Sequence, residues 1–247
     1  MTPIIVTIEG TDGSGKETQC NEISKKLKSL GFTVKQLSFP MYNSDSSYFV
    51  KQYLNGEYGD LSNTKINEYS GSLLFAMDRF ISYITDWSND IKKYDFIIMD
   101  RYVESNLIHQ GSKIKSISDI IRFIDWEKDF EYNKLGLPKP DITLFLNMSP
   151  DASAILRKNR KNKINNSDNQ DIHEADREYQ LKAYHTAYTI SDACEWKKIN
   201  CTNKEYVKSV KDIKPINEIT EMCINEIFSV PRVKRLLKKR AIEGVTL

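Results

Sequence analysis

The sequence IIVTIEGTDGSGK occupies residues 4–16 of this 247-residue chain. Residues 4–8 are all β-branched, which is typical of a strand buried on both faces of a parallel sheet. The stretch from Gly10 to Lys16 then fits the pattern G-x-x-x-x-G-K. Downstream, apolar residues at spacings of three and four predict a helix that Gly31 ends: Cys20, Ile23, Leu27 and Leu30. A strand, a glycine-rich loop and a helix thus follow one another, which is the setting that a phosphate-binding loop requires.

The rest of the chain repeats the alternation of strand and helix. Further strands are predicted at residues 33–39, 96–99, 142–146 and 196–199, with helical patterns between them. One long helix should run from Ile66 to Trp87. Strands that alternate with helices form parallel sheets with right-handed crossovers. We therefore predict a doubly wound α/β fold in which five parallel strands, flanked by helices, form a single domain over residues 1–247.

Composition excludes several classes of protein. The chain is 40% hydrophobic and 28% charged, as is usual for globular proteins. Its net charge of +2 is too small for the molecule as a whole to attract long nucleic acid electrostatically. No stretch approaches the roughly 18 apolar residues of a membrane span, and residues 4–8 are too short for a secretion signal. The four cysteines lack the spacing of a zinc site or a disulfide framework. We expect a cytoplasmic protein without a membrane partner, whose basic tail at about residues 229–247 either contacts an anionic partner or is simply solvated.

The glycine-rich loop supports the first chemical prediction. Glycines adopt backbone angles closed to other residues, so successive N–H groups can converge on phosphate oxygens at a helix N-terminus. Lys16 would add a positive charge at the β- and γ-phosphates. We predict a nucleotide site made of Gly10, Gly13, Ser14, Gly15, Lys16, Glu17 and Thr18. The alternative is a glycine-rich turn beside a solvated lysine.

The residue after Lys16 departs from the motif. Ser or Thr normally stands there and places a hydroxyl on Mg²⁺, whereas this chain has Glu17, with Thr18 one place later. A carboxylate is also a hard oxygen ligand, so Glu17 is a candidate metal ligand, directly or through water. The alternative is that Glu17 only favours the positive end of the helix.

Beyond the loop, the sequence resembles the thymidylate kinase family from about Ile4 to Ile199. The resemblance rests on four ordered blocks, EGTDGSGK at residues 9–16, FP at 39–40, LFAMDR at 74–79 and DRYVESN at 100–106. It implies a P-loop kinase that moves the γ-phosphoryl group of ATP to dTMP with Mg²⁺, and a homodimer. The alternatives are a kinase of another deoxynucleotide or nucleoside, and a nucleotide-binding protein that has lost catalysis, as Glu17 would allow.

The resemblance also assigns an acceptor site. Phe75 and Arg79 lie four residues apart, so one helix face presents an aromatic plane and a guanidinium fork, and in the family these positions grip thymine. From the helix alone, a core Phe with a solvated Arg is the simpler interpretation. The other acceptor positions that the resemblance assigns are Asp12, Phe39, Pro40, Arg101, Asn106, His109 and Gln110. Some members have tyrosine in place of His109, which leaves discrimination against ribose open.

Charged residues complete the predicted site. Asp100 and Arg101 directly follow a predicted strand, at the edge where open α/β sheets bind ligands. The family places this aspartate near the metal or the acceptor phosphate, the arginine on that phosphate, and Asp12 near the sugar and the metal. A purely structural Asp-Arg pair is the alternative. Members of the family place an essential arginine either in the phosphate loop or in a lid, and this loop contains none. The resemblance therefore implies that Arg157 or Arg160 supplies it from a lid at about residues 157–172 and acts in catalysis with Lys16.

Overall fold

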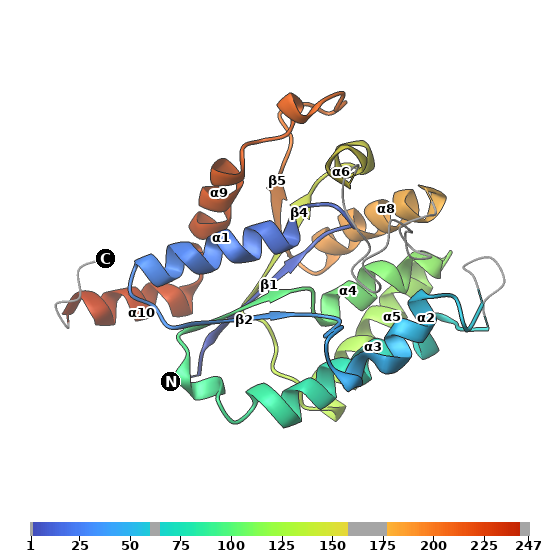
Figure 1. Ribbon diagram of the computed structural model, residues 1–247, viewed down its shortest axis with the longest axis horizontal. Coiled ribbons are helices and arrows are strands. Elements are labelled where there is room, and N and C mark those ends of the chain that lie inside the picture. The colour runs from blue at the N-terminus through green and yellow to red at the C-terminus, as the bar shows by residue number, and fades with distance from the viewer. Residues whose placement is uncertain (1, 60–64, 158–176, 243–247) are drawn as a thin grey trace.

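A parallel sheet forms the centre of the computed structural model, which describes residues 2–59, 65–157 and 177–242 (Figure 1). Its strands are β1 (Ile4–Glu9), β2 (Val34–Ser38), β3 (Phe96–Asp100), β4 (Ile142–Asn147) and β5 (Lys197–Asn200). They lie in the order β2-β3-β1-β4-β5, and each neighbouring pair is parallel. The predicted fold class is confirmed, and each predicted strand end agrees with the structure to within one residue.

Helices cover both faces of the sheet (Figure 1). One face carries α1 (Lys16–Ser29), α9 (Ile216–Ser229) and α10 (Pro231–Ile242). The other face carries α3 (Glu68–Ser82), α4 (Val103–His109), α5 (Ile117–Lys128) and α8 (Arg177–Ala193). Two shorter helices are α2 (Tyr48–Leu54) and α6 (Pro150–Arg157). Among the described residues, no helix combines the length and the apolar character that crossing a bilayer requires.

Short helical turns extend or connect these elements. Single π-helical turns follow α3 at Tyr83–Trp87 and α5 at Asp129–Lys134. Turns of 3-10 helix lie at Asp45–Ser47, Ile91–Lys93, Gly111–Lys113 and Val210–Asp212. The turn at Asp129–Lys134 matters most for the site, because π-helical turns redirect side chains within an otherwise continuous helix.

The middle strand, β1, is buried along its whole length, as its β-branched sequence predicts. Ile4, Val6 and Ile8 pack with the apolar stripe of α1 on one face of the sheet. Ile5 packs on the other face with residues of β2 and β3. In the parallel pairing with β3, Ile8 stands opposite Asp100. The loops that leave β1 and β3 therefore start side by side at the carboxyl edge of the sheet.

The long helix predicted between Ile66 and Trp87 is α3 together with its π-helical turn. Asn67 caps its start by accepting a hydrogen bond from the backbone N–H of Ser70, at 2.9 Å. Its apolar periodicity, however, does not mark a buried face. The side chains spaced along its outer surface are exposed, and they are Tyr69, Leu73, Met77 and Ile84.

The basic run near the C-terminus is neither a free tail nor simply solvated over the described residues. It forms α10, whose Val233 and Leu236 are buried in the main core. Arg232 pairs with Asp141 and also donates to the carbonyl of Thr2 at 2.9 Å, while Arg240 lies over the ring of Phe32 at 4.1 Å. Two of the basic side chains therefore hold α10 against the sheet.

Candidate active site

The loop after β1 has the backbone of a phosphate-binding loop. Gly13 and Gly15 have φ angles of 81° and 85°, a region that other residues rarely adopt. At Gly13 a side chain is also excluded by space, since a Cβ would lie 2.6 Å from Cγ of Arg157. Because α1 begins at Lys16, the last N–H groups of the loop lie at the positive end of a helix.

Two hydroxyl groups of this loop are buried without hydrogen-bond partners among the described residues. They are Oγ1 of Thr11 and Oγ of Ser14. The Lys16 ammonium instead donates to the carbonyls of Gly10, at 2.9 Å, and Thr11, at 2.8 Å. Burial, and next the nearby Arg101, lower the pKa of Lys16 to about 8. Unpaired buried donors beside a desolvated ammonium group fit a ligand rich in anionic oxygens.

Arg157 is the last residue of α6, the helix that follows β4, and its side chain reaches the phosphate loop. The methylene groups of its side chain pass directly over Gly13. Its Nε and Nη1 atoms are buried and have no hydrogen-bond partner among the described residues. The structure thus places Arg157 at the phosphate loop. Arg160 and the rest of the predicted lid, residues 158–172, lie outside the described residues.

A pocket opens next to the loop, and all nine predicted acceptor residues line it. These residues are Asp12, Phe39, Pro40, Phe75, Arg79, Arg101, Asn106, His109 and Gln110. Four lining residues were not predicted, namely Tyr42, Leu54, Asp78 and Ser105. They come from four separate segments, so no spacing in the sequence could have grouped them. The empty space among these side chains is about 540 Å³, part of which is open to solvent.

Arg101 stands between the pocket and the phosphate loop in a constrained conformation. Its φ of 68° lies in the left-handed region, which a side chain with Cβ rarely occupies. Its guanidinium group forms an ion pair with Asp12 and approaches Nε2 of His109 to 2.9 Å. Arg101, which was predicted to hold the acceptor phosphate, therefore contacts two residues that were predicted near the acceptor sugar, Asp12 and His109.

Glu9, which sequence reasoning missed, supports the turn that contains Arg101. Its carboxylate accepts hydrogen bonds from the backbone N–H of Tyr102, at 2.8 Å, and from the hydroxyl of Ser105, at 2.6 Å. The side chain is fully buried, and burial raises the pKa of Glu9 to about 7, against the opposing attraction of Arg101. The only sequence signal was a charged residue at the end of an apolar strand.

The deep end of the pocket contains buried amides and a buried ion pair. Arg79 is 2% exposed and forms a two-point ion pair with Glu131, at 2.7 and 2.5 Å. Asn106 lies beside this pair, 2.7 Å from Glu127. Gln110 is fully buried, and neither atom of its amide has a hydrogen-bond partner among the described residues. The glutamates were not predicted, because their spacing of four is ordinary on a helix surface.

Helix α8 supplies two further contacts that the sequence did not reveal. The hydroxyl of Tyr179 lies 2.8 Å from Nδ1 of His109. The amide of Gln180 donates to Asp12 at 3.3 Å. Both residues follow the segment predicted as the lid, so the chain beyond that segment returns to the pocket.

The proposed metal ligands are not gathered in one cluster. The Oδ1 atom of Asp100 is buried at the end of β3 with no partner among the described residues, which suits a cation nearby. Glu17 is exposed on the first turn of α1. Within the described ranges, no group of three or more acidic, histidine or cysteine side chains is arranged to hold a metal ion.

Comparison with known proteins agrees with this arrangement, since residues 8–213 match the sequence profile named thymidylate kinase. The chain belongs to the thymidylate kinase family. Thymidylate kinase from Mycobacterium tuberculosis is 33% identical over 147 residues, which are 59% of this chain and 66% of that protein. A probable thymidylate kinase from Methanosphaera stadtmanae is 28% identical over 75% of this chain and 86% of its own length.

Solved structures of thymidylate kinases share the fold. The enzyme from Candida albicans superposes with a TM-score of 0.65 at 21% identity, covering 94% of this chain and 93% of its own. The enzyme from Ehrlichia chaffeensis gives a TM-score of 0.58 at 18% identity, covering 92% and 100%. At these identities the likeness concerns the fold, and the thymidylate kinase family is established by the sequence profile.

Glu9 should make stability depend on pH in a predictable direction. Its folded pKa of about 7 exceeds the ordinary 4.5, so the folded protein binds more protons between these values and stability falls as pH rises. Relative to Glu9→Gln, the wild-type unfolding free energy should fall by about 2 to 3 kcal/mol between about pH 5 and pH 8. Urea unfolding of both proteins across this range measures the difference, and parallel pH curves would contradict the prediction.

Proposed function

We propose that this chain transfers the γ-phosphoryl group of ATP to dTMP, giving ADP and dTDP. One observation carries the proposal. A phosphate loop with unpaired buried donors meets a pocket whose wall presents Arg101 and Asp12 next to the loop and Arg79 and Asn106 at its deep end. The relatives named above as thymidylate kinases support this choice of acceptor.

The proposed reaction is mainly a matter of positioning and charge. An oxygen of the dTMP phosphate attacks the γ-phosphorus of ATP, and the bond between that phosphorus and the β–γ bridging oxygen breaks. Arg101 would hold the attacking phosphate, since a guanidinium fork matches two phosphate oxygens. Lys16 would exchange its bonds to the loop carbonyls for phosphate oxygens of ATP. No covalent enzyme intermediate is required.

A Mg²⁺ ion is part of the proposal. Asp100 would hold it, because its buried and unpartnered Oδ1 atom is a hard oxygen ligand near the phosphate loop. When bound, the ion would neutralise charge on the ATP phosphates. Glu17 is a second candidate ligand of the ion, depending on where the ATP phosphates lie. If the Mg²⁺ dependence of activity in Glu17→Gln overlays that of wild type, Glu17 is not a ligand.

A coupled assay of ADP release tests the proposed function. Purified protein is given ATP and, in turn, dTMP, dUMP, dCMP, dAMP and thymidine. The proposal expects the highest kcat/KM with dTMP. A preference for another monophosphate or for thymidine would favour the related-kinase alternative, and tight ATP binding without turnover would favour a protein that has lost catalysis.

Arg157 should act on the transition state more than on binding. Its unpaired donors lie at the phosphate loop, where charge develops as the bridging bond breaks. We expect Arg157→Ala to lower kcat by about 100-fold or more while the KM for dTMP changes by less than about threefold. Arg160→Ala is the matched variant, since it removes the other candidate arginine. Steady-state kinetics of both decide between them, and a normal kcat in Arg157→Ala would refute the assignment.

We also propose that the chain forms a homodimer through the exposed apolar surface of α3. Tyr69, Leu73, Met77 and Ile84 are each between 37% and 48% exposed, and they lie along one side of this helix. Contiguous apolar surface of this kind commonly marks a protein interface.

Leu73→Glu should disrupt this homodimer. A two-fold interface contains the substituted position twice, so two carboxylates would lose their hydration in apolar surroundings and we expect the dissociation constant to rise by about 100-fold or more. Analytical ultracentrifugation over a concentration series measures it. Leu181→Glu is the matched control, because Leu181 on α8 is 40% exposed against 44% for Leu73. Equal behaviour of the two variants would argue against the α3 interface.

A further inference from the structure

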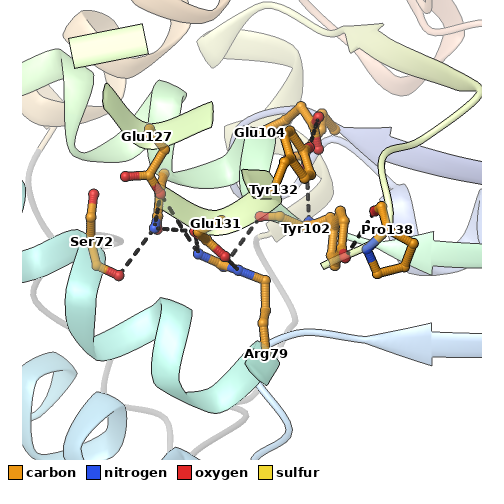
Figure 2. Close-up of polar contacts among 10 residues, drawn as sticks. Ser72, Arg79, Tyr102, Glu104, Glu127, Glu131, Tyr132 and Pro138 are labelled. Carbon is orange, nitrogen blue, oxygen red and sulfur yellow. Dashed lines mark hydrogen bonds and ion pairs between the residues drawn. The ribbon is translucent and has the colours of Figure 1, made fainter. Parts of the chain in front are cut away.

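Two buried glutamates, Glu131 and Glu127, accept hydrogen bonds from the side chains of Arg79 and Asn106. Figure 2 shows both glutamates beside Arg79. Glu127 comes from the last turn of α5, and Glu131 from the π-helical turn that follows it. Both glutamates are fully buried, and Arg79 and Asn106 are each 2% exposed. Such a group of buried polar side chains is costly to form, and the hydrogen bonds within it constrain its geometry. Among the described residues, Oε2 of Glu127 has no hydrogen-bond partner.

Arg79 donates three hydrogen bonds to protein groups, two to Glu131 and one to a backbone carbonyl. Its Nε and Nη2 atoms donate to the two carboxylate oxygens of Glu131, at 2.7 and 2.5 Å. Its Nη1 atom donates to the carbonyl of Tyr102 at 3.2 Å. Since a guanidinium group has five N–H donors, one remains on each terminal nitrogen. Arg79 also lines the pocket, so the donors left over are those it can offer to a ligand.

Asn106 is oriented by the same carboxylates. Its Nδ2 atom lies 2.7 Å from Oε1 of Glu127, 3.2 Å from the carbonyl of Ser72 and 3.3 Å from Oε1 of Glu131. These three acceptors compete for its two protons, which fixes the amide with its NH₂ group toward the cluster. The Oδ1 atom accepts no hydrogen bond from the described residues, and Asn106 lines the pocket. The amide therefore presents an acceptor to a ligand.

The two glutamates pair with Arg79 unequally. The Nη2 atom of Arg79 lies 2.5 Å from Oε1 of Glu131 and 3.9 Å from Oε1 of Glu127. Burial, and next the neighbouring Glu131, raise the pKa of Glu127 well above its ordinary range. Whether protonated or ionised, Glu127 offers Oε1 as an acceptor to Asn106.

We propose that Glu131 and Glu127 are positioning residues that set the hydrogen-bond polarity of the pocket, so that Arg79 donates and Asn106 accepts. A donor beside an acceptor complements a pyrimidine that presents a carbonyl oxygen beside a ring N–H. Thymine and uracil have this edge, whereas cytosine presents an amino group beside a bare ring nitrogen. The inference rests on the proposed function, and it identifies Glu131 and Glu127 as the residues that make the pocket prefer thymine or uracil to cytosine.

Direct binding of dTMP and dCMP, without ATP or Mg²⁺, tests the inference. Isothermal titration gives both dissociation constants, and thermal unfolding checks that each variant is folded. We expect Glu131→Gln to weaken dTMP binding by about tenfold or more and to reduce the preference over dCMP, because Arg79 loses one of its two anchoring points. Glu127→Leu should reduce the preference by about tenfold or more, because Asn106 is then free to turn its NH₂ group toward the pocket.

Conservative and matched variants separate positioning from stability. Glu127→Gln keeps an acceptor for Asn106 and mimics the neutral acid, so it should bind both nucleotides within about threefold of wild type. Glu104→Gln makes the same change at another buried carboxyl, which accepts a hydrogen bond from the hydroxyl of Tyr132 at 2.5 Å, and it should leave the preference unchanged (Figure 2).

Each result decides the inference. An unchanged preference in both Glu131→Gln and Glu127→Leu would overturn it, as would an equal loss in Glu104→Gln. If Glu131→Gln fails to fold, the comparison of Glu127→Leu with Glu127→Gln is sufficient, and equal preferences in that pair overturn the inference. A wild-type protein that does not bind dTMP would refute the proposed function itself, and the inference with it.

Discussion

The parallel pairing of β1 with β3 brings the two halves of the site together. Asp100 stands opposite Ile8 in this pairing, and the backbone N–H of Arg101 donates to the carbonyl of Ile8 at 3.2 Å. The Glu9 carboxylate then holds the first residues of the next turn. A left-handed conformation costs a residue such as Arg101 about 1 to 2 kcal/mol. The bonds from β1 offset this cost, so the phosphate loop and the acceptor arginine are fixed relative to each other.

The second feature of the site is the amount of charge that it buries. Lys16, Arg79, Glu9 and Glu131 are each at most 6% exposed. Buried charges interact more strongly than solvated ones, but only if each has its partners, because desolvation opposes burial. At the deep end of the pocket the partners are protein groups. At the phosphate loop the buried hydroxyls lack partners among the described residues, so that end is completed by a ligand.

Local patterns in the sequence predicted the fold and much of the site. Strands β1, β3 and β4 are mostly apolar runs, and the glycine pattern fixes the loop, so these could be found without knowledge of distant contacts. Glu9, Glu127, Glu131 and Gln180 were missed, because their importance comes from partners far away in the chain. Periodicity also could not tell that the outer side of α3 is exposed, since an apolar stripe on the outside of a helix has the same spacing as one that meets the core.

His109 stands where some members of the family have tyrosine, and both of its ring nitrogens have polar contacts in this structure. A guanidinium group only donates, so Nε2 of His109 must accept from Arg101. The proton of a neutral imidazole then lies on Nδ1, which donates to the hydroxyl of Tyr179. The histidine therefore connects the acceptor arginine to α8, the same helix that brings Gln180 to Asp12. Helix α8 therefore contacts both residues that were predicted near the acceptor sugar, so one helix positions the two side chains that flank Arg101.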